Sequence, residues 1–254
     1  MSKTTSKAKV VGIIPARLKS SRIQQKALLP ICGVPLVIHV LKRVQQSLDL
    51  SDVYVATDSE KIASLVEDNG GKAIMTSVKH KNGTERTTEA IRNIDGDVFV
   101  QIMGDEVLLN PEHIKVSLDA LKSSEGAAAS MLVTEFKKEN SIGDFKVVTN
   151  CDNEIMYISR GDIPCSKKNP VDYRLKAYHI TSWKRSALEA YRKIQKTPME
   201  KIEDHEFLRL IENGYKIVTK KVESECISLD HEEDIEYITK KMLNDKFFKE
   251  YKKI

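Results

Sequence analysis

The stretch VVGIIPARLKSSRIQQK, residues 10–26, joins a short apolar run to a loop rich in cations. Val10 to Pro15 has the length and composition of a buried strand that ends at a proline. The ten residues that follow, 17–26, carry four cationic side chains and two hydroxyl groups, which together with backbone N–H groups could hold phosphate oxygens. The stretch matches neither GxxxxGK(S/T) nor GxGxxG. A solvated basic loop therefore stays an equal alternative on spacing alone.

Strand-like and helix-like segments alternate on the C-terminal side of this loop. Strands are predicted at 53–57, 72–75 and 97–102, and helices at 35–44, 60–68, 84–94 and 111–121. This order predicts an α/β fold with a mostly parallel, mixed sheet and helices on both faces. Ligands bind at the carboxyl ends of such strands, so the loops at 16–26, Asp58 and 104–106 are expected to converge at one edge.

The second half of the chain has a different pattern. Strands are predicted at 127–136, 145–150, 155–159 and 215–222, with antiparallel pairing around a turn at 151–153. Helices are predicted at 183–194, at 201–213 and from Glu232 onward. We interpret residues 10–254 as one domain after a flexible tail at 1–9, with an insert for the sugar site or for dimerisation expected at about 135–185.

Composition excludes several classes of protein. With 41% hydrophobic and 31% charged residues, the 254-residue chain is typical of a globular domain. The net charge is only +4 and no basic, aromatic stripe occurs, so we expect no nucleic-acid partner. The four cysteines are scattered without a CxxC pair, which favours free thiols in a reducing compartment. No stretch is apolar enough for a membrane span or a signal core, so we expect a cytoplasmic protein that does not bind membranes.

Three further segments could carry chemistry. Gly104-Asp105-Glu106 follows a predicted strand, where a carboxylate could bind Mg²⁺, although Gly-Asp is also common in plain turns. In HKNGTER, residues 80–86, Thr84 would cap a helix whose free N–H groups suit an anion or a base, and capping alone is an equal alternative. Asp230 precedes an acidic helix start, which favours either a second metal carboxylate or simple compensation of the helix dipole.

Six segments in order make the chain resemble the 3-deoxy-manno-octulosonate cytidylyltransferases, or CMP-Kdo synthetases. The family reads roughly IIPAR, STRLPGKPL, VATD, HxSGTER, QGDEP, YFSR and VDTPEDL, and the matching segments here are IIPARLKSSRIQQKALL, VATD (55–58), HKNGTER, MGDEV (103–107), YISR (157–160) and LDHEEDI (229–235). The resemblance covers nearly the whole chain. It implies a single domain of the nucleotide-diphospho-sugar transferase type, which is Rossmann-like, and a homodimer.

The resemblance also implies a reaction: CTP and 3-deoxy-manno-octulosonate (Kdo) give CMP-Kdo and pyrophosphate for surface polysaccharide such as lipopolysaccharide. The sugar's anomeric hydroxyl would attack the α-phosphate, with Mg²⁺ as the cofactor held by Asp105 and Asp230. Arg17, Lys26 and Asp105 are the implied catalytic residues. The implied nucleotide-binding residues are Ala16, Arg17, Ser21, Arg22, Lys26, Thr57, Asp58, Asn82, Gly83 and Arg86. The implied acceptor-binding residues are Met103, Arg160, Tyr178, Glu206 and Phe207.

The chain departs from the family pattern mainly among the residues expected to bind the sugar. Met103, Ala177 and Phe207 stand where the family has Gln, His and Gln, and Gln24-Gln25 replaces a Pro-Gly in the loop. A pocket that loses hydrogen-bonding groups changes its substrate preference. We therefore hypothesise an acceptor that is Kdo, a Kdo variant or another 2-keto-3-deoxy acid. Two alternatives stay open: a nucleotidyltransferase for another nucleotide or acceptor, and a homologue that binds nucleotide but has lost catalysis.

Overall fold

The apolar run at the start of the sequence forms β1 (Val10–Ala16), which lies in the interior of a mixed sheet. The computed structural model describes residues 8–20, 23–165, 168–225, 227–229 and 231–252. The other strands in these ranges are β2 (Pro30–Ile31), β3 (Val34–Pro35), β4 (Asp52–Thr57), β5 (Lys72–Met75), β6 (Val98–Ile102), β7 (Ala129–Phe136), β8 (Lys146–Thr149), β9 (Ile155–Ser159), β10 (Arg174–Lys184) and β11 (Ile217–Lys221).

The main sheet has the order β11-β7-β10-β6-β1-β4-β5, and the β8–β9 hairpin pairs with β10 beside this path. β1 pairs in parallel with β4 and β6, β4 with β5, and β7 with β11. β10 is antiparallel to both of its neighbours, β6 and β7, so along this path of described strands it is the one that runs against the others. The predicted mostly parallel, mixed sheet is therefore confirmed.

β10 is the element that the sequence prediction missed. Its eleven residues, RLKAYHITSWK, do not alternate cleanly, because the register shifts between Tyr178 and Thr181. The prediction placed Trp183 in the following helix, but Trp183 is the fully buried penultimate residue of the strand. Missing β10 matters because this strand joins the two halves of the sheet.

The helices are α1 (Leu36–Gln45), α2 (Glu60–Asp68), α3 (Gly83–Ala90), α4 (Glu112–Ser123), α5 (Arg185–Lys193), α6 (Pro198–Glu203), α7 (Phe207–Ile211), α8 (Asp234–Asn244) and α9 (Lys246–Tyr251). Short 3₁₀ turns span Lys26–Leu28 and Ile91–Asn93. The predicted ranges 60–68, 72–75 and 155–159 coincide with α2, β5 and β9. No helix in the described ranges combines the length and the apolar composition that a bilayer span requires.

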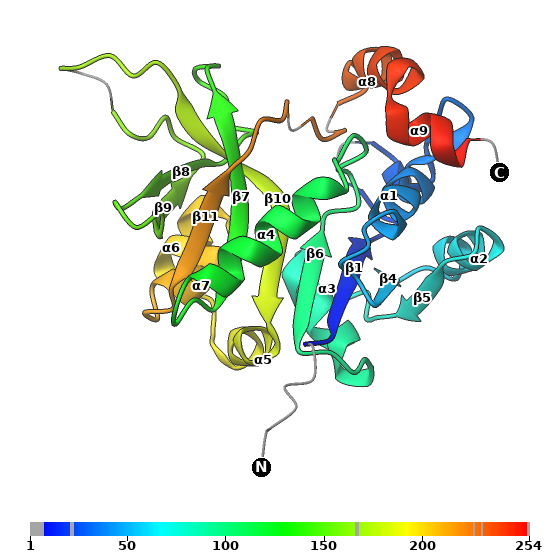
Figure 1. Cartoon of the computed structure of the whole chain (residues 1–254), viewed down its shortest axis with the longest axis horizontal. Coiled ribbons are helices and arrows are strands. Elements are labelled where there is room, and N and C mark those ends of the chain that lie inside the picture. The colour runs from blue at the N-terminus through cyan, green and yellow to red at the C-terminus, as the bar shows by residue number, and fades with distance from the viewer. Residues whose placement is uncertain (1–7, 21–22, 166–167, 226, 230, 253–254) are drawn as a thin grey trace.

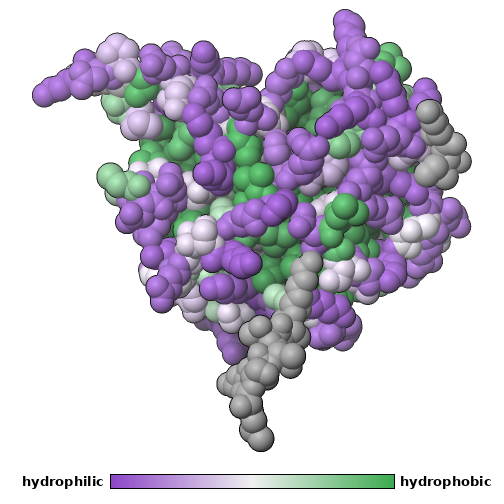
Figure 2. Space-filling model, in the orientation of Figure 1, coloured by the Kyte–Doolittle hydropathy of each residue, from purple (hydrophilic) through white to green (hydrophobic). Residues whose placement is uncertain are grey.

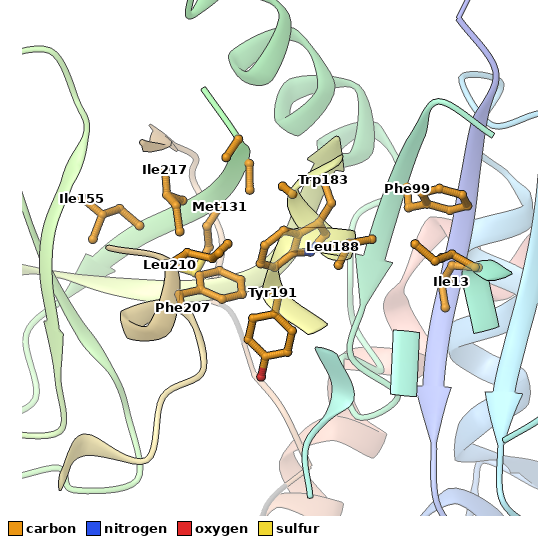
Figure 3. Packing of buried hydrophobic residues seen from close by; sticks show 14 of the residues in the cluster. Ile13, Phe99, Met131, Ile155, Trp183, Leu188, Tyr191, Phe207, Leu210 and Ile217 are labelled. Atoms are coloured by element: carbon orange, nitrogen blue, oxygen red, sulfur yellow. The ribbon is translucent and has the colours of Figure 1, made fainter. Parts of the chain in front are cut away.

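Helices cover both faces of the sheet, as predicted. Apolar residues of α1, α2 and α4 pack with Ile14, Val100 and Ile102 on one face, and α4 crosses in front of β10 and β6 in Figure 1. Apolar residues of α3, α5 and α7 pack with Ile13 and Phe99 on the other face. Figure 3 shows part of this second core, in which Trp183, Phe207 and Tyr191 gather beside β10. Successive residues of a strand point to opposite faces of the sheet, so Ile13 and Ile14 pack in different cores.

Two predicted helices are each divided in two. The predicted helix at 201–213 is α6 and α7, because Asp204 ends α6 in the left-handed region with φ 54°. The predicted C-terminal helix is α8 and α9, because Asp245 is extended and its carboxylate caps α9 by accepting from the Phe248 amide at 2.8 Å. Both breaks occur at an aspartate. Because aspartate also occurs inside helices, the sequence alone does not predict them.

The C-terminal helices cover the β2–β3 hairpin and α1, and Figure 1 shows them at the opposite side of the molecule from β8 and β9. The imidazole of His39 on α1 is fully buried, with Nε2 donating to the Ile31 carbonyl at 2.8 Å and Nδ1 accepting from the Tyr251 hydroxyl at 2.7 Å. Hydrophilic residues cover most of the face in Figure 2, and hydrophobic residues are visible mainly near its centre.

Candidate active site

A cavity of about 400 Å³ lies at the carboxyl ends of β1 and β6. Its loop side consists of Pro15, Arg17, Ser20, Lys26, His80, Lys81, Asn82, Gly83, Arg86, Asp105 and Ser228. Its β10 side consists of Gln101, Met103, Gly143, Phe145, Arg160, His179, Thr181, Asp204, His205, Glu206 and Phe207. The predicted convergence of loops at this edge of the sheet is therefore confirmed for Arg17, Ser20 and Lys26 of the first loop and for Asp105 of the second.

On the loop side, the segment after β1 is fastened to the protein by its backbone. The Leu18 amide donates to Asp58 Oδ1 at 3.1 Å. Arg86 holds the other carboxylate oxygen, donating to Asp58 Oδ2 at 2.9 Å and to Thr76 Oγ1 at 2.6 Å. The Arg86 guanidinium is thus occupied by protein partners, whereas Arg17 is exposed beside the cavity. Asp58 and Arg86 hold the loop in place, and Arg17 is the side chain that can reach an anion.

Asp105 and Lys26 form the charged centre of the loop side. Lys26 Nζ donates to Asp105 Oδ2 at 2.7 Å, and the two side chains are 13% and 29% exposed. Gly104 allows this approach, because a Cβ atom there would lie 2.9 Å from the Pro15 carbonyl oxygen. The carboxylate therefore lies at the end of β6, where a cation and a phosphate could both reach it.

The start of α3 forms the third part of the loop side. The Asn82 side chain accepts from the Glu85 amide at 2.8 Å and donates to the Tyr191 hydroxyl at 3.1 Å. Gly83 packs closely, because a Cβ atom there would lie 2.9 Å from Met103 Sδ. The cap is therefore two residues earlier than predicted, at Asn82 rather than Thr84. The free backbone N–H groups at the start of this helix can donate to an anion.

The β10 side is built from aromatic and imidazole rings. His179 and His205 stack with their ring centroids 6.2 Å apart and their planes at 23°. Phe145 meets both rings edge-on, at 4.4 Å from His205 and 6.4 Å from His179. The Arg160 guanidinium lies over the Phe145 ring at 4.0 Å and donates to the Ile142 carbonyl at 2.9 Å.

The two histidines have opposite protonation tendencies. Burial lowers the pKa of His179, but its contact with the buried Glu106 carboxylate, Nδ1 to Oε1 at 3.6 Å, outweighs burial and raises the pKa overall. Burial holds the pKa of His205 well below its usual value, and the nearby His179 and Arg160 lower it further. At neutral pH His205 is therefore an uncharged ring.

The predicted site residues fall into four groups. Those that line the cavity are Arg17, Lys26, Asn82, Gly83, Arg86, Met103, Asp105, Arg160, Glu206 and Phe207. Ala16, Thr57 and Asp58 lie behind the loop: Ala16 and Thr57 are buried, and Thr57 Oγ1 accepts from the Ser59 amide at 3.3 Å. Ser21, Arg22 and Asp230 lie outside the described residues. The fourth group is Tyr178 alone.

The assignment of Tyr178 to the acceptor site is contradicted. Its ring packs in the core on the opposite face of the sheet, and its hydroxyl accepts from the Asn110 amide at 3.3 Å. Adjacent strand residues point to opposite faces, so His179 faces the cavity and Tyr178 does not. Sequence reasoning missed His179, His205 and Phe145, because their convergence depends on the unpredicted strand β10.

A metal site can be tested against this donor set. Within the described ranges, no group of three or more His, Cys, Asp or Glu side chains is arranged to hold a metal ion. The part-exposed Asp105 carboxylate in the cavity is, however, the kind of ligand that Mg²⁺ takes when phosphate oxygens and water complete its shell. The donor set therefore fits a Mg²⁺ ion bound together with a nucleotide better than a closed protein cage.

Comparisons with known proteins agree with this geometry. The family model described as Cytidylyltransferase matches residues 11–221. A mitochondrial 3-deoxy-manno-octulosonate cytidylyltransferase of Arabidopsis thaliana is 38% identical over 91% of this chain and 82% of its own length. The Geobacter metallireducens enzyme of the same name is 33% identical over 92% and 98%. The structure of CMP:2-keto-3-deoxy-manno-octonic acid synthetase complexed with CTP superposes with a TM-score of 0.88, at 30% identity over 93% of this chain and 99% of that one.

Proposed function

The chain belongs to the 3-deoxy-manno-octulosonate cytidylyltransferase family, and we propose that it transfers CMP from CTP to the anomeric hydroxyl of Kdo or a Kdo-like 2-keto-3-deoxy acid, releasing pyrophosphate. The observation that carries this proposal is the cavity that pairs Lys26 with Asp105 on its loop side and places Arg160 opposite them. The related structure that covers nearly the whole chain was obtained with CTP.

The loop side supplies what a nucleoside triphosphate requires. Arg17 and Lys26 can neutralise phosphate charge, and the N-terminus of α3 offers N–H groups to an oxygen of the nucleotide. Asp58 and Arg86 keep the loop in position before the ligand arrives, so less conformational freedom is lost on binding. Arginine and lysine that are already in place stabilise the charge that builds up on the phosphate oxygens during transfer.

The β10 side holds the acceptor against the nucleotide. The new bond forms between the sugar's anomeric oxygen and the α-phosphorus, while the bond to the leaving pyrophosphate breaks. Arg160 is available for the acid's carboxylate, and its position is fixed because its backbone amide donates to Glu203 at 3.0 Å. Such a reaction depends mainly on orientation and on charge stabilisation.

We further propose that Mg²⁺ is the cofactor and that Asp105 is one of its ligands. The donor set fits, since Mg²⁺ is usually held by one or two carboxylates together with phosphate oxygens and water. When bound, the ion would withdraw charge from the phosphate oxygens. Lys26 would orient the Asp105 carboxylate through the hydrogen bond from its Nζ atom. The second proposed ligand, Asp230, lies outside the described residues.

The remaining expectations from the sequence are also proposals. We propose a cytoplasmic enzyme, for which Cys32, Cys151 and Cys165, all free thiols, suit a reducing compartment. We propose a homodimer and a place in surface polysaccharide synthesis, as for lipopolysaccharide. Exposed Ile142, Met156 and Ile202 near the β8–β9 hairpin are apolar surface that a second copy would cover. Equilibrium sedimentation would measure the mass in solution.

The decisive experiment is pyrophosphate release from CTP and Mg²⁺ with Kdo and related acids. Asp105→Asn is the inactive control, and Asp119→Asn, a change of an exposed acid on α4, is the matched active control. A panel of nucleotides separates cytidylyl transfer from the alternative of another nucleotide. Tight CTP binding without release for any acceptor would point to an acceptor outside the panel, or to the alternative of a homologue that has lost catalysis.

A further inference from the structure

Three polar side chains on the β10 side have hydrogen-bonding capacity that the protein does not use. Gln101 and His205 are only 3% and 2% exposed, and the His179 side chain, which is 32% exposed, contacts Glu106 through Nδ1. Gln101 Nε2 donates to Thr84 Oγ1 at 3.2 Å, but Gln101 Oε1 has no partner. No protein partner is found either for Nε2 of His179 or of His205. These statements hold for the residues that the structure describes.

The backbone amide of Phe207 fixes the hydrogen-bonding role of His205. The Phe207 amide donates to His205 Nδ1 at 3.3 Å, so the proton of the neutral ring lies on Nε2. His205 lines the cavity, and its remaining polar atom is therefore an N–H donor. A ligand atom that satisfies it must be an acceptor, such as an oxygen.

His179, whose ring is nearly parallel to that of His205, presents a second donor in its protonated form, which the neighbouring Glu106 carboxylate favours. Glu106 Oε1 lies 3.6 Å from His179 Nδ1 and also accepts from Ser228 Oγ at 3.2 Å. Glu106 is 1% exposed and lies on the Nδ1 side of the His179 ring, which leaves Nε2 for a ligand. Phe145 meets both imidazoles edge-on and limits their rotation. The two rings thus form a rigid pair of donors.

An apolar setting makes these polar groups selective. Met103, Phe145 and Phe207 line the cavity beside them, so a ligand without the matching oxygen would leave the buried N–H group of His205 unpaired. An unpaired buried group costs roughly 1–3 kcal/mol, and sites built in this way reject analogues strongly.

The three polar groups also lie two residues away from the departures seen in the sequence. Met103, Ala177 and Phe207 are the apolar replacements, and Gln101, His179 and His205 precede or follow them by two positions. Residues two apart share one face of a strand, which brings Gln101 and His179 into the cavity on β6 and β10. The polar lining of this pocket has therefore moved along its elements.

We propose that Gln101, His179 and His205 are the specificity-determining residues for the acceptor. His179 and His205 donate to oxygens of the acidic sugar, and Gln101 Oε1 accepts from one of its hydroxyl groups. The inference rests on the proposed function and states which groups of this chain select its acceptor. The oxygens belong either to the carboxylate or to the hydroxyl groups, and analogues of the sugar distinguish these two sources.

The first test compares His205→Phe with His205→Gln in steady-state kinetics with Kdo as the probe. We expect His205→Phe to raise the KM for Kdo about ten- to hundredfold and leave the KM for CTP within about twofold. His205→Gln should recover most of the loss, because its amide can place an N–H group near the original Nε2. A merely structural role would not be rescued in this way.

The matched control is His113→Phe. His113 is a part-buried histidine on α4 that packs edge-on against Tyr178 at 5.7 Å, away from the cavity. This variant should leave both KM values unchanged. Equal KM values for Kdo in wild type and His205→Phe would overturn the proposal.

A binding experiment separates failure of this proposal from failure of the proposed function. Calorimetry of Kdo with CTP-loaded Asp105→Asn measures acceptor binding without turnover. Adding His205→Phe to that variant should weaken Kdo binding about tenfold or more. Retained affinity would contradict the role of His205. Acceptor binding without turnover in the wild type would instead count against the proposed function.

Analogues of Kdo identify the oxygens. Removing the oxygen that His205 contacts should weaken catalysis in the wild type but cause no further loss in His205→Phe. A carboxamide analogue tests the carboxylate, and single deoxy analogues test the hydroxyl groups. Independent, additive losses for every analogue would overturn the assignment.

Discussion

The loop side and the β10 side of the cavity face each other, but they differ in how they were built. The loop side uses charged residues that each belong to a short segment at the end of a strand or the start of a helix, and the contacts of Asp58 with Leu18 and Arg86 hold these segments together. The β10 side uses rings and amides from β6, β10 and the turn before α7, which meet only in the folded chain. The comparison teaches that the charged segments of this site can be recognised one at a time in the sequence, whereas the selectivity that we infer depends on strand β10, which the sequence did not reveal.

The largest expected effect is on the loop side. Lys26→Met should lower kcat/KM on the order of 10³-fold with every acceptor, because it removes a preorganised cation from the phosphates and from Asp105. Pyrophosphate release measures the effect. Lys115→Met, at an exposed position on α4, is the matched control and should have normal kinetics. If the loss of kcat/KM differed between acceptors, Lys26 would also affect acceptor selection, and the division of roles between the loop side and the β10 side would be wrong.

The next effect is on the stability of the β10 side. Phe207→Gln restores the polar residue of the family pattern, but the Phe207 ring is 2% exposed and packs edge-on against Trp183 at 4.7 Å. We expect the free energy of unfolding to fall by about 3–4 kcal/mol. Chemical denaturation measures this, with Phe207→Leu as the milder control. A stable Phe207→Gln enzyme would show that this side can return to the family pattern without cost.

Acid should weaken the scaffold of the loop side through His39. Burial lowers the pKa of His39 to about 4, and the nearby Arg43 lowers it further, although hydrogen bonding to Ile31 opposes this. Because the unfolded pKa is about 6.5, the unfolded chain takes up the proton first. The neutral His39 ring therefore contributes to the free energy of unfolding above pH 6.5. This contribution, at most roughly 3 kcal/mol, is lost as the pH falls toward 4.

Denaturation of wild type and His39→Gln at several pH values measures this contribution. The variant is expected to be less stable at pH 7 but to have a flatter dependence on pH between 6.5 and 4. Identical slopes for the two proteins would show that other groups control the acid sensitivity.

The smallest expected effect concerns the loop itself. Gln25, at the family's glycine position, has φ 49° and ψ 38°, so the left-handed turn is retained without glycine. Gln25→Gly should raise the free energy of unfolding by about 1 kcal/mol and leave kcat unchanged. Gln24 has no such φ, so Gln24→Gly should give no gain. Destabilisation by Gln25→Gly would falsify this account of the loop.

Local features of the fold and of the loop side were predictable from the sequence. α2, β5 and β9 coincide with their predicted ranges because apolar spacing, caps and glycines act within a few residues. Arg17, Lys26 and Asp105 were singled out through the resemblance to the cytidylyltransferase family, because spacing alone left a solvated basic loop and a plain turn as alternatives. The predicted roles of these residues stay proposals, and those of Ser21, Arg22 and Asp230 lie outside the described residues.

The sequence by itself therefore determined an α/β chain with its charged residues at the ends of β1 and β6. Only the tertiary structure decided that β10 lies between β6 and β7, that Tyr178 turns away from the cavity, and that His179 meets His205. The physical reason is that hydrophobic periodicity and capping specify local conformation. Strand order and register depend on contacts between residues far apart in sequence, and these set which side chains share one cavity.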